Sequence, residues 1–516
     1  MSKVQVVARA HGAVLYGIDA VPVEVQAARS VGQPRAAIVG QAENEVKESR
    51  ERIRVALHSS GIEMSDGSNA VIINLAPADV RKSGTGLDLA MTLAVAATGH
   101  KWLHSCLDRV MCYAEVGLDG KLRPVRGTLS VAMAAREMNL DAIIVPPEAA
   151  REAAEVKDIA VWAVADLSAA MDRLRGDRSA ESSWPPARQA IVVDECDLRE
   201  IRGQRAARRA LEVAASGGHN LLFIGPPGAG KTMLARRVPG ILPPLTRAEA
   251  LDVTRIHSVA GLVSPGTGLV KTRPFRAPHH SVSAVGLIGG GSSPRPGEVS
   301  LANDGVLFLD ELPEFPRHVL ETLRQPLEDG HISIVRATGS ATFPTRFLLI
   351  AAMNPCPCGF HGAEARRCAC SPQAVQRYRA RLSGPLLDRI DMQVPVRALP
   401  PRAITRSSEG ECSAEVRARV LEARQRQEHR NKDFGVLWNS QIKNRDLPRA
   451  THLSEKAQCL LEDSMERLQL SARAHNRILK VARTLADMAG EEHVGPKQIT
   501  EAVSYRSLDR QEPAAW

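Results

Sequence analysis

The sequence predicts an α/β protein of several domains, and three observations support this. A chain of 516 residues is longer than one hydrophobic core normally organises, so two to four domains are expected. Residues 1–175 alternate short apolar runs with helical stretches. Around residue 225, an apolar run (LLFI) leads through a glycine-rich loop into a segment able to form a helix (TMLARRV), which is the order of a parallel βα unit.

The first block of the chain contains three strand-like runs and two clear helical patterns. The strands are expected at Ala36–Val39, Ala70–Leu75 and Ala142–Val145, where apolar residues run together. Helical spacing of apolar residues predicts helices over Glu43–His58 and Ser130–Met138. This block is therefore expected to form an α+β domain.

Two polar stretches divide the rest of the chain. The Ser- and Pro-containing stretch 176–189 is typical of a linker. A helix at Gln204–Ala215 and a strand at Asn220–Ile224 open the second block, and the Pro-rich, charged stretch Leu399–Glu411 precedes a final helical block. The expected organisation is an N-terminal domain (1–175), a linker (176–189), a core (190–397) and a helical C-terminal domain (398–516).

Composition narrows the class of protein. Lys plus Arg (67) exceed Asp plus Glu (58) by nine, and the pI is about 9.2, which favours a polyanionic partner but also fits an ordinary basic surface. The first residues lack the apolar segment of a signal peptide, and no run of about 18 apolar residues is present. We therefore expect a soluble, cytoplasmic protein without a membrane partner.

The glycine-rich loop GPPGAGKT fits the pattern G-x-x-x-x-G-K-[ST], in which backbone N–H groups surround phosphates. Lys231 can reach the β- and γ-phosphates, and the Thr232 hydroxyl can bind Mg²⁺. The alternative is a simple turn between a strand and a helix. The predicted ATP-binding residues of this loop are Gly225, Pro226, Pro227, Gly228, Ala229, Gly230, Lys231 and Thr232.

A pair of acids follows an apolar strand about 80 residues later, in VLFLDE. Asp310 is expected to hold Mg²⁺ through water together with Thr232, and Glu311 to polarise the attacking water. By itself the pattern also fits a strand that ends in solvated acids, but the glycine-rich loop favours the catalytic interpretation.

Three further polar residues complete the predicted site. Asn354 follows the apolar strand Phe347–Met353 and can orient the water beside the γ-phosphate. Arg389 lies too far along the chain to close on its own loop, so we expect it to serve the ATP of a neighbouring subunit. Arg473, in a helix of the last block, can reach the γ-phosphate of its own chain. Each arginine also fits a simple solvated charge.

These motifs together resemble the magnesium-chelatase-like AAA+ ATPases of the competence-protein ComM (YifB) group. The resemblance rests on segments throughout the chain, among them VKESRERIRVAL, INLAPADV, AEVGLDGKLRPVRG, GQRAARRALEVAASGGHNLLFIGPPGAGKT, RPFRAPHHSVSAVGLIGGG, GVLFLDELPEF, AAMNPCPCG and LSGPLLDRID. It implies an AAA+ P-loop domain with a helical C-terminal lid, with Asp310 and Glu311 as Walker B. It also implies Asn354 as sensor 1, Arg389 as an arginine finger and Arg473 as sensor 2.

For function, the resemblance implies a homo-hexameric ring with helicase-type branch migration on single-stranded or branched DNA, in recombination during natural transformation. Two alternatives stay open: a motor subunit that drives metal insertion into a porphyrin, and a remodeller of protein partners. Chelatase motor chains lack the fused N-terminal domain, which favours DNA. ATP hydrolysis stimulated by DNA or only by a protein distinguishes these functions.

An insertion at Gly330–Arg346 is expected to form a hairpin just before the strand that leads to Asn354. In this superfamily such a hairpin projects into the pore of the ring, so Arg336 and the loop Arg273–His280 are candidates for phosphate contacts. Simple packing is the alternative for the hairpin. His279 and His280 are not expected to bind a metal, because adjacent residues do not share a helix face and no acidic partner is expected nearby.

Four of the nine cysteines form the pattern C-x-C-x₉-C-x-C. Four thiolates can close a tetrahedral structural Zn²⁺ site, although the spacing differs from the common C-x₂-C. The alternative is four free thiols in a flexible loop. The predicted zinc ligands are Cys356, Cys358, Cys368 and Cys370.

The N-terminal block resembles the Lon-type protease fold, but it lacks that fold's catalytic pair. In KSGTGLDLA, Gly86 stands where the nucleophilic Ser belongs, and in PVRGTLSVA, Leu129 stands where the Lys base belongs. Lys82 and Ser83 are adjacent, but adjacency in sequence does not make a dyad. Without a nucleophile and a base, covalent catalysis is not expected, so the domain is predicted to serve in ring formation or partner binding.

Overall fold

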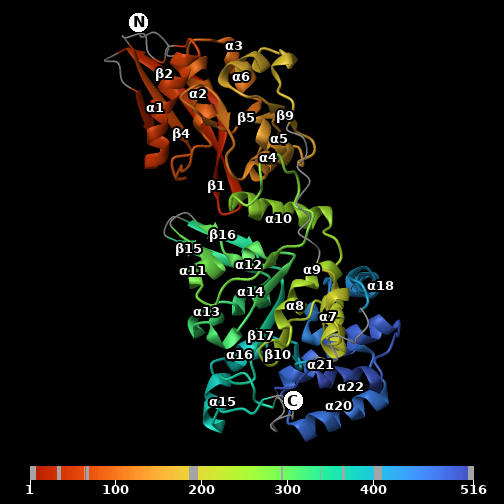
Figure 1. Ribbon diagram of the computed structural model, residues 1–516. Coiled ribbons are helices and arrows are strands. Elements are labelled where there is room, and N and C mark those ends of the chain that lie inside the picture. The colour runs from red at the N-terminus through yellow and green to blue at the C-terminus, as the bar shows by residue number, and fades with distance from the viewer. Residues whose placement is uncertain are drawn as a thin grey trace.

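The computed structural model of the chain describes residues 7–31, 36–62, 64, 69–184, 196–291, 294–336, 339–362, 366–399 and 410–508. Within these residues the strands form a seven-stranded sheet, a five-stranded sheet and three two-stranded ribbons. Figure 1 shows the seven-stranded sheet in the N-terminal half of the molecule and the five-stranded sheet in the other half, with helix α10 (Arg247–Val259) between them.

The seven-stranded sheet has the strand order β3-β4-β2-β1-β5-β8-β9. β2 pairs with β1 and β4 in antiparallel fashion, and the remaining neighbours are parallel. Helix α2 (Asp88–Ala97) is buried along its whole length because it is apolar on every side. The other elements are β1 (Val7–Tyr16), β2 (Asp19–Val31), β3 (Ala36–Val39), β4 (Asn69–Ala76), β5 (Val110–Cys112), β8 (Ala142–Val145), β9 (Ala160–Ala163), α1 (Asn44–Ser59), α3 (Trp102–Leu107), α4 (Thr128–Glu137), α5 (Pro147–Ala153), α6 (Leu167–Leu174) and the ribbon β6 (Glu115–Val116) with β7 (Leu122–Arg123).

The five-stranded sheet is parallel throughout, with the order β11-β14-β17-β10-β18. Every residue of β10, β14 and β17 is buried, as expected for parallel strands covered on both faces. Because the carboxyl ends of these neighbouring strands meet at one edge, residues that follow them are brought together. The strands are β10 (Leu221–Ile224), β11 (Phe275–Arg276), β14 (Val306–Leu309), β17 (Leu348–Met353) and β18 (Met392–Pro395).

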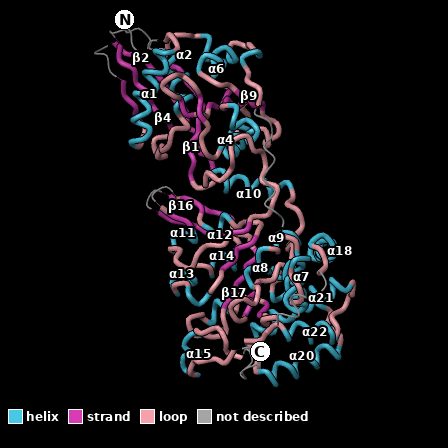
Figure 2. The backbone as a smooth tube through the Cα atoms, in the orientation of Figure 1, coloured by secondary structure: helices cyan, strands magenta, loops and turns pink. Residues whose placement is uncertain are grey.

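Helices and two small ribbons surround this sheet. The ribbon β15–β16 stands apart from the sheet on the side that faces the N-terminal half (Figure 2). The helices are α7 (Arg205–Gly217), α8 (Lys231–Arg236), α9 (Val238–Ile241), α11 (Ala284–Ile288), α12 (Glu298–Leu301), α13 (Arg317–Glu321), α14 (Arg324–Asp329), α15 (Pro372–Arg379) and α16 (Gly384–Leu387). The ribbons are β12 (Gly289–Gly290) with β13 (Arg295–Pro296), and β15 (His331–Arg336) with β16 (Gly339–Pro344).

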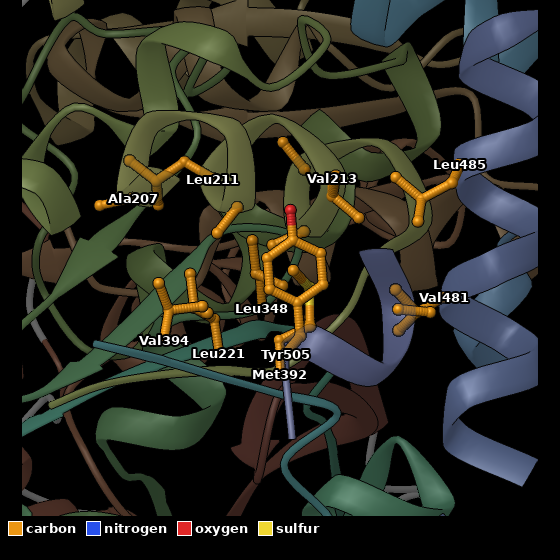
Figure 3. Close-up of a cluster of buried hydrophobic side chains, with 14 of the residues drawn as sticks. Ala207, Leu211, Val213, Leu221, Leu348, Met392, Val394, Val481, Leu485 and Tyr505 are labelled. Carbon is orange, nitrogen blue, oxygen red and sulfur yellow. The ribbon is translucent and has the colours of Figure 1, made fainter. Parts of the chain in front are cut away.

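The C-terminal segment is helical and shares its hydrophobic core with the five-stranded sheet. Figure 3 shows Val481 and Leu485 of one C-terminal helix beside Val213 of α7, with Tyr505 between that layer and the strand residue Met392. The segment therefore packs as part of the core rather than as a separate body. Its helices are α18 (Ser413–Asn431), α19 (Leu447–Thr451), α20 (Glu455–Leu468), α21 (Ala472–Ala489) and α22 (Pro496–Ser504).

Most predicted elements are present, with ends displaced by one or two residues. The strands predicted at Ala36–Val39 and Ala142–Val145 have those bounds, and the hairpin predicted within Gly330–Arg346 is β15–β16. Residues 337–338 of its turn, 185–189 of the predicted linker, 400–409 and 509–516 lie outside the described residues. In the part of the chain that the structure describes, helices lack the length and apolar character needed to cross a membrane.

Candidate nucleotide-binding site

The glycine-rich loop connects β10 to α8 at the carboxyl edge of the parallel sheet. Gly228 and Gly230 have φ angles of +77° and +88°, in the left-handed region that favours glycine. A side chain built at either position would meet no atom within 4 Å, so the loop leaves open space beside its backbone. The buried LLFI strand before the loop and the helix that begins at Lys231 fix both ends of this phosphate-binding turn.

Lys231 is buried and points along the inside of the loop. Its Nζ donates hydrogen bonds to the carbonyl oxygens of Gly225 (2.6 Å) and Pro226 (3.0 Å) and to Oδ1 of Asn354 (3.1 Å). Burial lowers the pKa of Lys231, while the charges of Asp310 and Glu311 oppose that shift. The contact brings Asn354, which directly follows β17, to the lysine that is expected to bind phosphate.

The two predicted magnesium ligands are in direct contact. Thr232 Oγ1 donates to Oδ2 of Asp310 over 2.7 Å. A hydroxyl and a carboxylate beside a phosphate-binding loop are oxygen donors of the type that Mg²⁺ prefers. The donor set thus fits a magnesium ion between Thr232 and Asp310.

Glu311 has an unusual backbone, and the structure adds a neighbour that sequence patterns missed. Its φ is +51°, a left-handed conformation that is uncommon for a residue other than glycine and typical of functional turns. Nδ1 of His280 lies 3.7 Å from Oε2 of Glu311, so the expectation that no acidic partner lies near His280 is wrong. His280 follows β11, the strand beside β14, but a two-residue strand carries no periodicity from which this position could be predicted.

Arg389 and Arg473 lie near each other, and each forms ion pairs within its own chain. Arg389 pairs with Glu328 and donates to the carbonyl oxygen of Pro385 over 2.6 Å. Arg473 donates to Asp388 over 2.6 Å, and its side chain is 72% exposed. Both therefore lie around the end of α16, whereas Lys231, Thr232, Asp310 and Asn354 form one contact group. Their predicted roles as finger and sensor 2 stay predictions.

A buried ion pair fixes α21 beside this region. Arg477 Nη1 donates to Oδ1 of the fully buried Asp391 over 2.8 Å, and His219 lies 3.6 Å from the same carboxylate. Burial, the largest single influence, would raise the pKa of Asp391, but Arg477, His219 and Lys480 together outweigh it and hold that pKa far below its usual range. Arg473, four residues earlier on α21, is thereby positioned next to the loop that carries Arg389.

The four clustered cysteines come together in space, immediately after Asn354. Their sulfur atoms all lie within 4.8 Å of one another, and three pairs are 3.4–3.6 Å apart. A tetrahedral zinc site with Zn–S bonds of about 2.3 Å requires sulfur separations of about 3.8 Å. Backbone N–H groups of His361 and Cys370 donate to Cys356 and Cys368, as metal-bound thiolates require. The cluster can therefore hold a metal ion.

The cysteine loop also packs against the phosphate-binding loop. Gly359 has a φ of +85°, and a Cβ built on it would lie only 2.5 Å from Pro227 Cδ. The cysteine cluster begins two residues after Asn354, and its loop packs against Pro227. It therefore lies directly beside the candidate nucleotide site.

Two arginines that the sequence offered for phosphate binding are occupied by internal contacts. Arg273 is buried, pairs with Glu249 at 3.2 Å and donates to the carbonyl oxygen of Asp304. Arg276 pairs with Glu298 at 2.7 Å. Both arginines are thus paired within the fold, and the expectation that the loop Arg273–His280 contacts phosphate stays a prediction. Arg336 of the hairpin remains exposed.

Gly86 and Leu129, the positions at which a Lon-type site would need its nucleophile and base, are both enclosed by the fold. A side chain on Gly86 would place its Cβ 2.3 Å from the ring of Tyr113, whose hydroxyl donates to the carbonyl of Arg126. Leu129 is fully buried, and its N–H donates to Oε1 of Glu152 over 2.8 Å. The Tyr113 ring thus fills the space beside Gly86, and Leu129 is part of the buried core.

Comparison with known proteins agrees with this geometry. Family models match residues 197–404 (magnesium chelatase, subunit ChlI), 410–506 (magnesium chelatase, subunit ChlI C-terminal) and 23–149 (subunit ChlI of Mg-chelatase). The fold and the site thus define a ChlI-like ATPase of AAA+ type.

Three relatives cover nearly the whole chain. The uncharacterized protein YifB of Salmonella typhimurium is 41% identical over 97% of both chains. The competence protein ComM of Haemophilus influenzae is 40% identical over 96% of both chains. The uncharacterized protein Rv2897c of Mycobacterium tuberculosis is 40% identical over 96% of this chain and 98% of the relative. The chain belongs to the magnesium-chelatase-like family of ComM and YifB proteins, a membership that implies ATP and Mg²⁺ as ligands.

Proposed function

We propose that the protein is an ATP-driven motor that moves DNA junctions during recombination, as a homo-hexameric ring. One observation carries the proposal. The exposed hairpin β15–β16 leads within three residues into β17, and β17 ends at Asn354, which contacts Lys231. A short, fully buried strand thus connects the nucleotide site to a hairpin with an exposed arginine. The relative named competence protein ComM supports a role in the uptake and recombination of DNA.

The site residues have distinct proposed roles. The glycine-rich loop and Lys231 bind the phosphates, and Thr232 and Asp310 hold Mg²⁺, which supplies charge stabilisation on the phosphates. Glu311 takes the proton of the attacking water, and Asn354 orients that water. Arg473 releases Asp388 and contacts the γ-phosphate of the ATP that is bound to its own chain.

The ring follows from Arg389. In one chain this residue pairs with Glu328 rather than with the phosphate loop. If Arg389 serves the ATP of the next subunit, each active site lies between two subunits, and a closed series of such head-to-tail interfaces is a ring. The N-terminal half, which we propose to be a non-proteolytic Lon-like domain, and the C-terminal helices, proposed as the lid, complete each subunit.

Two alternative functions have their own support. The ChlI family models favour a motor subunit for metal chelation, and the exposed hairpin face also fits a protein partner. Measuring ATP hydrolysis with DNA, a porphyrin or a protein partner added distinguishes the three functions, because each function predicts a different activator.

ATP hydrolysis by the wild-type chain is expected to rise when single-stranded or branched DNA is added. This stimulation is expected to become smaller as the salt concentration increases. Phosphate contacts release counterions, so binding weakens steeply between about 50 and 200 mM salt. Steady-state ATP hydrolysis, measured across this range with each DNA and with none, checks this. Stimulation by a protein partner or a porphyrin but not by DNA would contradict the proposal.

We also propose that the metal in the cysteine cluster is Zn²⁺, in a structural role, because four sulfur ligands leave no open position. Protein purified without added zinc is expected to contain about one Zn²⁺ per chain, and Cys358→Ser with Cys368→Ser about none. Elemental analysis measures this at neutral pH, where thiolates are available. Cys459→Ser is the matched control because Cys459 is exposed and lies outside the cluster. Less than about 0.1 equivalent in the wild-type protein would contradict the zinc site.

A further inference from the structure

The hairpin β15–β16 has one apolar face that it cannot bury by itself. Ile332 and Ile334 of β15 pair across the ribbon with Phe343 and Ala341 of β16, and all four side chains are buried. The other face, with His331, Ser333 and Val335 (69%), is exposed, and Arg336 beside the turn is exposed at the end of the row that begins with Ile332 and Ile334. An isolated two-stranded ribbon is marginally stable in water, so the position of this hairpin depends on what covers its apolar face.

The cover comes from the N-terminal half of the chain. The turn between β1 and β2 places Ile18 in one buried cluster with those four hairpin side chains, together with Ile256 of α10 and Leu301 of α12. Figures 1 and 2 show this end of β1 reaching toward α10 and β16. The end of a strand pair that is more than 300 residues earlier in the chain is therefore part of the hairpin's own core.

The approach is close at two glycines. A Cβ on Gly17 would lie 2.9 Å from Cβ of Ala341, and a Cβ on Gly339 would lie 2.5 Å from the hydroxyl of Tyr16. The Ala341 side chain thus packs against the backbone of Gly17, and the Tyr16 ring packs against the backbone of Gly339, with no room for a larger residue at either position. Such packing fixes the hairpin in one orientation.

Polar contacts hold the same turn from the opposite side. Ser130 Oγ donates to the carbonyl of Ile18 over 2.6 Å in a buried position, and Arg255 of α10 pairs with Asp19 at 2.6 Å. A separate buried set of hydrogen bonds ties α10 to the N-terminal half, where the Gly127 N–H donates to Ser258 Oγ (2.9 Å). The hydroxyl of Ser258 in turn donates to Glu152 (2.5 Å). The turn is therefore anchored independently of the hairpin, so it can act as a fixed support.

We infer that the β1–β2 turn, through Ile18, is the element that positions the DNA-contacting hairpin. This inference rests on the proposed function and assigns the N-terminal half a mechanical role in it. In this role Ile18 contacts neither nucleotide nor nucleic acid; it holds the hairpin in place, so that the exposed Arg336 beside the turn can reach the strand to be moved.

Ile18→Asp is the direct test, measured as ATP hydrolysis with and without forked DNA. An unpaired carboxylate cannot stay within the apolar cluster, so the hairpin loses its support. We expect the DNA-stimulated component to fall by about tenfold or more, as expected for loss of a positioned phosphate contact. Hydrolysis without DNA and the KM for ATP are expected to stay within about twofold. Ile18→Val, which keeps the apolar contact, is expected to restore stimulation.

Leu118→Asp is the matched control, because Leu118 is 56% exposed in the same half of the chain and lies outside the cluster.

Arg336→Ala is expected to lower the DNA-stimulated component of hydrolysis as well. In the double variant with Ile18→Asp this component is expected to be no lower than in Ile18→Asp alone, because both residues act through one hairpin. Loss of basal hydrolysis in Ile18→Asp would indicate that this variant does not fold. In that case Ile18→Ala replaces it, and hydrogen exchange is measured over residues 331–344. Faster exchange in this segment than in the wild type is expected.

The possible outcomes distinguish failure of this inference from failure of the proposed DNA-motor function. A wild-type protein that DNA does not stimulate would overturn the proposed function. A stimulated wild type, with Ile18→Asp equally stimulated or with unchanged hydrogen exchange over the hairpin in Ile18→Ala, would overturn the positioning role alone.

Discussion

Substitution of Glu311 by Gln is expected to leave ATP binding intact and to slow hydrolysis by about 10²–10⁴-fold, the range attributed to general-base catalysis. Glutamine keeps the size of the side chain but cannot accept the proton of the attacking water. Thr232, Asp310 and Lys231, which we propose to hold the nucleotide and its Mg²⁺, are not changed in this variant, and neither is the hydrogen bond between Thr232 and Asp310. The measurement is single-turnover hydrolysis together with direct titration of ATP binding.

Two further variants are compared with Glu311→Gln: one that is expected to lose ATP binding, and one that serves as the matched control. Lys231→Ala is expected to lose nucleotide binding itself, because it removes the ammonium group that hydrogen-bonds within the loop and to Asn354. Glu314→Gln, three residues after Glu311 and paired with Arg381 on the surface, is the matched control and should hydrolyse ATP as the wild type does. Wild-type hydrolysis by Glu311→Gln would show that the catalytic base lies elsewhere.

Replacing Arg389 by Ala is expected to reduce hydrolysis by about 10³–10⁵-fold while sparing ATP binding, as for arginine fingers in related phosphoryl transfers. The guanidinium stabilises charge that develops only in the transition state, so its loss affects the rate rather than the affinity. Arg377→Ala, an exposed arginine of α15, is the matched control. A variant that binds ATP weakly but hydrolyses it at the normal rate would rule out the finger.

Mixing two inactive proteins tests whether Arg389 acts between subunits. In a ring, an Arg389→Ala subunit has an intact phosphate loop and can receive Arg389 from a neighbouring Lys231→Ala subunit. The mixture is therefore expected to hydrolyse ATP faster than either protein alone. No recovery in a mixture that forms mixed rings would place the arginine in the active site of its own chain.

Local patterns explain which parts of the site could be predicted from the sequence. The LLFI strand with GPPGAGKT, the VLFL strand with Asp310, and the apolar run before Asn354 each combine a buried strand with a polar end. Parallel strands of one sheet bring such ends to a common edge, so the contacts of Lys231 with Asn354 and of Thr232 with Asp310 follow from the pattern. The cysteine cluster likewise follows from spacing within fifteen residues.

Contacts between distant segments could not be predicted in this way. Nothing in the sequence near Ile18 indicates that it belongs to one buried cluster with Ile334 and Phe343. The sequence around Arg273 likewise gives no sign of its ion pair with Glu249. His280 reaches Glu311 only because β11 pairs with β14. Such contacts depend on the tertiary fold, whereas propensity and spacing report only on neighbours along the chain.

The most direct test of the account is movement of a labelled four-way DNA junction. Wild-type protein with ATP at about 50–100 mM salt is expected to convert the junction into its branch-migrated products. A non-hydrolysable ATP analogue, or Lys231→Ala protein with ATP, is expected to leave it unchanged. Equal conversion under all three conditions, or none by wild-type protein that has formed rings, would contradict a DNA motor and favour the protein-remodelling function.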